Sequence, residues 1–124
     1  MRTVVLSAFG PAEQTLSLAD RPLPEPGPGQ IRVKMLLSPI HNHDLMIIAG
    51  EYGIKPPLPH VPGTEAVGIV DKLGEGVATL AVGQRVAGGA QATWADYYLA
   101  PAQGVVPVPD EIDDATASQL VKID

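Results

Sequence analysis

Short runs of alternating apolar residues, separated by proline and glycine, are the feature that most restricts the fold of this chain. Its 124 residues include 13 glycines and 13 prolines. The clearest run, residues 30–37, places Ile31, Val33, Met35 and Leu37 on one face of a strand. Because proline and glycine punctuate the chain so often, we expect many short strands joined by turns. The chain is therefore predicted to be mainly β, a partly open antiparallel barrel with short helices.

Further strands are expected in similar runs. They are a first strand over residues 3–8, its hairpin partner at Leu16–Ala19, a long strand at Thr64–Leu73, and short strands at Gln84–Ala87, Trp94–Leu99 and Val105–Val108. Gly68 lies inside the long strand and predicts a bulge or a close approach of another backbone. Gly88-Gly89 is expected to form a turn.

Helices are predicted at residues 41–49 and from Asp113 to Leu120. His41 or Asn42 can cap the first helix, and Asp44 in its first turn suits the helix dipole. Asp113 or Asp114 is expected to cap the second helix in the same way.

Two apolar residues of the first helix, Leu45 and Ile48, share one face at three-residue spacing and are expected in the core. Residues 1–112 are expected to form one domain. Residues 113–124 would then begin a connecting helix or a closing segment.

The composition excludes several classes of partner. Hydrophobic residues make up 45% of the chain and the formal net charge is −6. Because an acidic chain repels phosphates, neither nucleic acid nor an anionic membrane surface is expected as a partner. No apolar run is long enough to span a membrane. The absence of cysteine removes disulfides and thiolate ligands and, without a signal peptide, predicts a cytoplasmic protein.

Several motifs of this chain occur together in one known superfamily. They are the loop Pro24–Gln30, the helix start at Asp44, the turn Gly63-Thr64-Glu65, and the segments Val70–Val77, Gly83–Val86 and Thr93–Tyr97. In order and type they resemble the N-terminal, GroES-like domain of the medium-chain dehydrogenases/reductases, the superfamily of the alcohol dehydrogenases. The pattern is most similar to the zinc-independent quinone oxidoreductases and 2-enoyl thioester reductases. The resemblance ends where those enzymes enter their dinucleotide-binding domain.

A pyrophosphate-binding loop is not expected at Gly74-Glu75-Gly76. This motif lies between two predicted strands, and no third glycine precedes a helix. A dinucleotide fingerprint needs both features. We therefore predict a hairpin turn there.

A zinc site is not expected either, because a catalytic zinc needs about three protein ligands at one point. The resemblance places His41 where zinc-dependent relatives carry a cysteine ligand, and Thr64 where they carry a histidine. Glu65 remains, but one imidazole and one carboxylate are too few. A zinc-dependent alcohol dehydrogenase with a degenerate metal site stays open as an alternative.

The neighbouring polar residues are expected to have structural rather than metal-binding roles. His43 should face away from His41 on the helical turn, and His60 should be a solvent-facing loop residue. Glu65 is expected to accept hydrogen bonds from backbone amides or from an arginine such as Arg85.

The resemblance also assigns roles to four residues. Reduction of an activated double bond by hydride transfer builds negative charge on the substrate oxygen, which a held hydroxyl can stabilise or protonate. Tyr52 resembles the tyrosine that does this in the family, so catalysis and substrate binding are expected there; packing on the surface is the alternative. Met46 is expected to line the substrate cleft or to join the core. His41, in place of the usual asparagine, and Thr64 are expected to contact the cofactor.

The sequence therefore predicts the substrate-side domain of a zinc-independent, NAD(P)H-dependent oxidoreductase that acts on quinones, enones or enoyl thioesters. NADPH is implied only together with the nucleotide-binding domain, so the isolated chain is expected to be inactive. An apolar interdomain face is expected to favour self-association. The alternative from another class is a standalone, non-catalytic GroES-like binding module.

Overall fold

A computed structural model describes residues 1–53 and 55–118 of the chain. The strands are β1 (Arg2–Leu6), β2 (Leu16–Asp20), β3 (Gln30–Leu37), β4 (Glu65–Leu73), β5 (Arg85–Gly89), β6 (Tyr97–Pro101) and β7 (Val105–Pro107). The helices are α1 (Ala12–Thr15), α2 (Asn42–Ala49) and α3 (Asp114–Ala117), with a 3-10 turn η1 (Ala102–Gly104). The prediction of a mainly β chain with short helices is confirmed.

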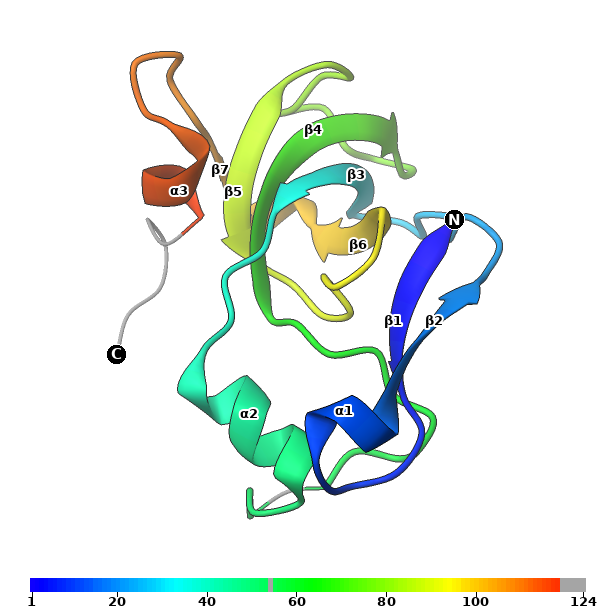
Figure 1. Ribbon diagram of the computed structural model, residues 1–124. Coiled ribbons are helices and arrows are strands. Elements are labelled where there is room, and N and C mark those ends of the chain that lie inside the picture. Colours follow the sequence, from blue (N-terminus) through cyan, green and yellow to red (C-terminus); the bar gives the residue numbers. More distant parts are fainter. Residues whose placement is uncertain (54, 119–124) are drawn as a thin grey trace.

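The strands form two sheets, a β1–β2 hairpin and a five-stranded sheet in the order β6-β3-β4-β5-β7 (Figure 1). Every pairing between the described strands is antiparallel. The larger sheet is strongly curved but does not close, since β6 and β7 remain its two edges among the described residues. This matches the expected partly open antiparallel barrel.

The core lies inside the curve of the larger sheet. Ile31 and Val33 of β3 are fully buried and pack with Val70 of β4 and Val86 of β5. The residues between them on β3 point outward, and Arg32 there pairs with a carboxylate at 2.7 Å, that of Asp71. The alternation therefore places Ile31 and Val33 in the core, whereas Leu37, beyond the register shift, is 38% exposed.

Gly68 lies where β3 and β4 come closest. It pairs with Met35, and the register shifts between Met35 and Leu37. A side chain at this position would collide with the carbonyl oxygen of Lys34. The predicted close approach at Gly68 is thus confirmed, and the register shift accompanies it.

Two predictions about the later strands were wrong. Gly88 and Gly89 do not form a turn but end β5, opposite Ala66 and Glu65 of β4. Gly88 is required because a Cβ atom there would collide with the carbonyl oxygen of Gly104, the last residue of η1. The strand expected at Trp94–Leu99 begins later, at Tyr97, because the preceding residues form a loop that packs on other segments.

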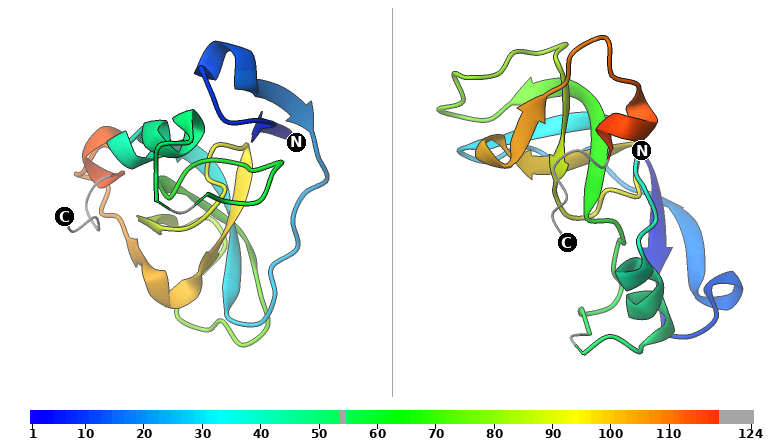
Figure 2. Two further views of the ribbon diagram at one scale, coloured as in Figure 1. Left: turned by 90° about the horizontal axis from the view of Figure 1, so that it is seen from below. Right: turned by 90° about the vertical axis from the view of Figure 1, so that its left-hand side faces the viewer.

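The β1–β2 hairpin and helices α1 and α2 lie on one side of the larger sheet, as the two turned views make clear (Figure 2). Isolated bridges connect β1 to the rest of the chain, pairing Thr3 with Ala95 and Leu6 with His60. Helix α1 was not expected from the sequence. Its four residues follow Pro11, whose carbonyl oxygen accepts a hydrogen bond from Thr15 Oγ1 at 3.0 Å.

Helix α3 lies beside β5 and β7 (Figure 1). Asp113 caps it as predicted, its carboxylate accepting a hydrogen bond from the Thr116 amide at 2.8 Å. Arg85 of β5 fixes the helix by pairing with Asp114 at 2.7 Å. The structure describes this helix to Ala117, and the last part of the predicted helix, residues 119–120, lies outside the described residues.

Candidate functional site

The candidate site begins at the first turn of α2. His41 is the N-cap residue with extended backbone angles, and its amide donates to Asp44 Oδ2 at 2.9 Å. Asp44 is only 2% exposed. A buried carboxylate that binds the cap amide satisfies an otherwise unpaired donor and suits the positive end of the helix. The sequence-predicted cap therefore fixes the main chain that carries His41.

The side chain of His41 binds Glu65. Glu65 is the first residue of β4, is 4% exposed, and its Oε1 lies 2.8 Å from His41 Nε2. At this distance a ring N–H at Nε2 can donate a hydrogen bond to the carboxylate oxygen. Backbone amides or an arginine such as Arg85 were the expected partners of Glu65, but its carboxylate binds His41 instead. Arg85 binds Asp114 and the carbonyl oxygens of Pro109 and Ile112.

The turn before Glu65 is held tightly. Gly63 has a φ of +103°, and a Cβ atom there would clash with Thr93 and lie 2.5 Å from the Trp94 ring. Ser38 Oγ donates to the Glu65 carbonyl oxygen at 2.7 Å and lies 2.8 Å from Thr93 Oγ1. These contacts fix the direction in which Glu65 leaves the turn.

His43 joins the same cluster, contrary to the expectation that it would face elsewhere. Its ring stacks on that of His41 with centroids 5.4 Å apart and planes 16° from parallel. Its Nε2 lies 3.0 Å from Thr64 Oγ1 and 3.5 Å from Asp44 Oδ1. The cap residue has extended backbone angles, so helical spacing does not apply between these two histidines. The sequence feature that could have predicted this contact is the position of the His43 imidazole, two residues after the cap residue His41.

Tyr52 lies next to His43 in the loop after α2. The two rings are 6.4 Å apart and inclined by 49°, and Tyr52 is 38% exposed. The helix ends at Gly50, whose φ of 78° turns the chain into this loop. Tyr52 is thus placed at the surface beside a histidine that Thr64 holds.

Met46 lies further along α2 and is half-buried, with its sulfur 3.6 Å from the Asn42 amide nitrogen. Ile48 is 3% exposed, as expected for a core residue. Leu45 is 51% exposed, so its assignment to the core was wrong. The structure therefore brings His41, Thr64 and Tyr52 together through His43, and places Met46 one turn away along the helix.

His60 is half-buried rather than solvent-facing. Its backbone exchanges hydrogen bonds with Leu6 of β1 at 2.7 and 3.0 Å. Burial lowers the pKa of its imidazole below the usual value of 6.5, and the Asp44 carboxylate offsets part of that shift. His60 therefore joins the segment before the Gly63 turn to β1.

The donor set of this cluster is poor for a metal ion. Over residues 1–53 and 55–118, no three histidine, cysteine, aspartate or glutamate side chains converge on one point. His41 and Glu65 are already bound to each other. In the same described part of the chain, no helix is long and apolar enough to cross a membrane.

Comparison with known proteins identifies the family. The alcohol dehydrogenase GroES-like domain matches residues 27–110. The mitochondrial enoyl-[acyl-carrier-protein] reductase of Xenopus tropicalis is 32% identical over 121 residues, which are 96% of this chain and 35% of that protein. The chain thus spans about a third of this relative's length.

Solved structures agree with this match. The human synaptic vesicle membrane protein VAT-1 homolog-like protein has a TM-score of 0.92 at 32% identity, over 97% of this chain and 39% of that one. The Escherichia coli quinone oxidoreductase in complex with NADPH has a TM-score of 0.89 at 27% identity, over 97% and 37% of the two chains. The fold, the matched residues and these relatives together show that the chain belongs to the alcohol dehydrogenase GroES-like domain family of the medium-chain dehydrogenases/reductases.

Proposed function

We propose that this chain is the substrate-side domain of a zinc-independent, NADPH-dependent oxidoreductase that reduces quinones, enones or enoyl thioesters. The observation that carries the proposal is the cluster in which His41, His43, Thr64 and Tyr52 converge beside Glu65. Quinone and enoyl reductases are among the proteins that this chain resembles.

The proposed role of Tyr52 follows from its exposure and its neighbours. A phenolic O–H at this place can donate a hydrogen bond to a substrate carbonyl oxygen. When bound, the reduced nicotinamide supplies the hydride, and the negative charge then grows on that oxygen. A donor already held at this place stabilises the charge without reorganisation. His43 and Thr64 would orient the ring rather than react.

The proposed role of His41 and Thr64 is to bind the cofactor. Their side chains offer an imidazole and a hydroxyl, which suit ribose hydroxyls and the nicotinamide amide. Glu65 fixes the imidazole of His41, so its orientation is set before binding. Gly74-Glu75-Gly76 is a turn between the antiparallel strands β4 and β5, as predicted, and it does not open a helix. The pyrophosphate would therefore be held by a separate nucleotide-binding domain.

Zinc independence is proposed from the donors, because thiolates are absent from the sequence and His41 already binds Glu65. Without the nucleotide-binding domain, the 124-residue chain should not turn over a substrate. We also propose that Met46 lines the substrate cleft, because its half-buried side chain lies one turn along α2 from Asn42.

The test uses the longest product that the gene encodes and follows NADPH oxidation with a benzoquinone, an enone and a crotonyl thioester. Tyr52→Phe should lower kcat by about 100-fold or more, as expected for loss of a positioned proton donor. Tyr97→Phe is the matched control, because Tyr97 lies on β6 away from the cluster and should keep wild-type turnover. Unchanged turnover of Tyr52→Phe would remove the role of Tyr52. No NADPH oxidation by the wild type with any of the substrates would overturn the proposed function.

A further inference from the structure

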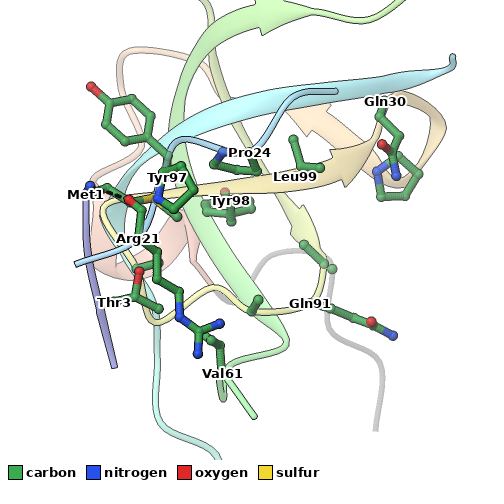
Figure 3. Close-up of a pocket in the computed structure, with 16 residues that line it drawn as sticks. Met1, Thr3, Arg21, Pro24, Gln30, Val61, Gln91, Tyr97, Tyr98 and Leu99 are labelled. Carbon is green, nitrogen blue, oxygen red and sulfur yellow. Dashed lines mark hydrogen bonds between the residues drawn. The ribbon is translucent and has the colours of Figure 1, made fainter. Parts of the chain in front are cut away.

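A cavity of about 840 Å³ opens between the β1–β2 hairpin, the proline segment after β2, strand β6 and the loop after β5 (Figure 3). Its volume lies within the range of small-molecule sites, roughly 300–1,000 Å³. The residues of the candidate site do not line it. The two places are neighbours, since the amide of Ala90, a lining residue, donates to the Thr64 carbonyl oxygen at 3.0 Å.

The walls of this cavity are mostly apolar. Tyr97, Tyr98 and Leu99 of β6 form one side, and Pro24 and Val61 lie around it (Figure 3). No aspartate or glutamate is among the residues that line it, although acids outnumber basic residues in the chain as a whole. A ligand with an apolar body would therefore bury its surface here without meeting a carboxylate.

Arg21 supplies the one side-chain cation among the lining residues. Its side chain extends into the cavity between Thr3 and Val61 (Figure 3). Arg2, Arg32 and Arg85 each pair with a carboxylate, at 3.4, 2.7 and 2.7 Å. Within residues 1–53 and 55–118, the guanidinium of Arg21 has no hydrogen bond or ion pair. Three of the four arginines are thus neutralised, and the fourth is left facing an apolar cavity.

The main chain at Arg21 is fixed, because its amide donates to the Met1 carbonyl oxygen at 2.9 Å. Beside it, Thr3 Oγ1 is also buried without a hydrogen-bond partner among the described residues. A planar guanidinium binds a carboxylate through two parallel hydrogen bonds. Met1 also lines the cavity, and its α-ammonium donates a hydrogen bond to the Arg21 carbonyl oxygen at 2.6 Å.

We propose that this cavity binds a small amphipathic monocarboxylate, with the carboxylate on Arg21 and the apolar body against β6. The site is distinct from the candidate site and does not depend on the proposed oxidoreductase activity. Decanoate is the probe, and 1-decanol is its uncharged analogue. Binding of each to the purified 124-residue chain is measured by isothermal titration calorimetry.

Decanoate should bind more tightly than decanol to the wild type. Arg21→Gln should weaken decanoate binding by at least about tenfold and leave decanol binding unchanged, because charge-assisted hydrogen bonds are lost and the apolar walls remain. Arg2→Gln is the matched control, since Arg2 pairs with Asp96 and does not line the cavity. It should leave both affinities unchanged. Leu99→Trp should weaken both ligands by filling the cavity.

A readout on the wild type keeps the proposal testable if a variant fails to fold. The Arg21 side-chain NH signal in an NMR titration should shift on adding decanoate and stay in place on adding decanol. Equal affinities for the two ligands, with no effect of Arg21→Gln, would reduce the site to an apolar surface and overturn the proposal. So would the absence of binding by the wild type. If the gene encodes a longer product, loss of decanoate binding in it would show that other residues fill the cavity, which would equally overturn the proposal.

Discussion

Replacing Gly68 with alanine should be strongly destabilising, because the added methyl group has no space between the two central strands. The Cβ atom would collide with the Lys34 carbonyl oxygen and lie 2.5 Å from Val33 Cγ1 and 3.1 Å from the Lys34 carbonyl carbon. Two of these neighbours are backbone atoms, which cannot rotate away. β3 and β4 must therefore separate, and the hydrogen bonds near Lys34 and Ile69 lengthen.

The expected magnitude combines three effects. Overpacking a well-filled core costs about 1–3 kcal/mol, and a weakened ladder hydrogen bond costs about 1 kcal/mol. Alanine restricts the unfolded chain more than glycine, which returns about 0.4–1 kcal/mol. We expect a net loss of about 2–3 kcal/mol in the free energy of unfolding. For a domain of this size that corresponds to a fall in Tm of roughly 10 °C.

The assay is urea unfolding followed by far-UV circular dichroism, with Gly53→Ala as the matched control. A Cβ atom at Gly53 would meet nothing within 4 Å, so that variant should stay within about 0.5 kcal/mol of the wild type. A folded Gly68→Ala protein as stable as Gly53→Ala would refute the argument that backbone contact requires glycine in β4.

Three further predictions concern burial. Burial raises the pKa of Tyr98 well above its usual value of 10. The contribution of Tyr98 to stability is therefore complete below pH 10. It falls as the pH rises above 10, because the tyrosine ionises first in the unfolded chain. Urea unfolding between pH 9 and 11 should show a loss of up to about 1.4 kcal/mol per pH unit that Tyr98→Phe lacks. The lowered pKa of His60 makes stability depend on pH in the opposite direction. Its contribution is complete above pH 6.5 and is lost as the pH falls through that value. In unfolding curves measured from pH 7.5 to 5, His60→Gln should weaken this dependence. Ile48→Ala should cost about 2–5 kcal/mol, whereas Leu45→Ala should cost less than about 1 kcal/mol; similar values for the two in urea unfolding would contradict their placement on α2.

Features that depend on neighbours in sequence were predictable. Alternation predicted the inward face of β3 as far as Met35, and the cap at His41 with Asp44 in the first turn located α2 within a residue. The close approach at Gly68 followed from a glycine inside an otherwise apolar strand. Each of these is set by a rule that acts over a few residues.

Features that depend on distant contacts were not predictable. The pairing of His41 with Glu65 joins residues 24 positions apart, and nothing in either local sequence selects that partner over Arg85. Gly88 sits in a strand because of a crossing backbone, which sequence alone cannot distinguish from a turn. Helix α1 has four residues, too few to show a period. The side-chain partners of the candidate site therefore had to come from the structure.

The loop that precedes β6 contains a residue whose fluorescence can report on the candidate site. The sequence has one tryptophan, Trp94, so all indole emission comes from a single place. Its amide donates to the Pro62 carbonyl oxygen at 3.1 Å, its carbonyl oxygen accepts from Val4, and its Nε1 is buried without a partner among the described residues. The ring lies against the Gly63 turn that leads to Thr64 and Glu65. The residue as a whole is half-buried. Any event that displaces the turn should therefore change the wavelength of its emission maximum, without a label.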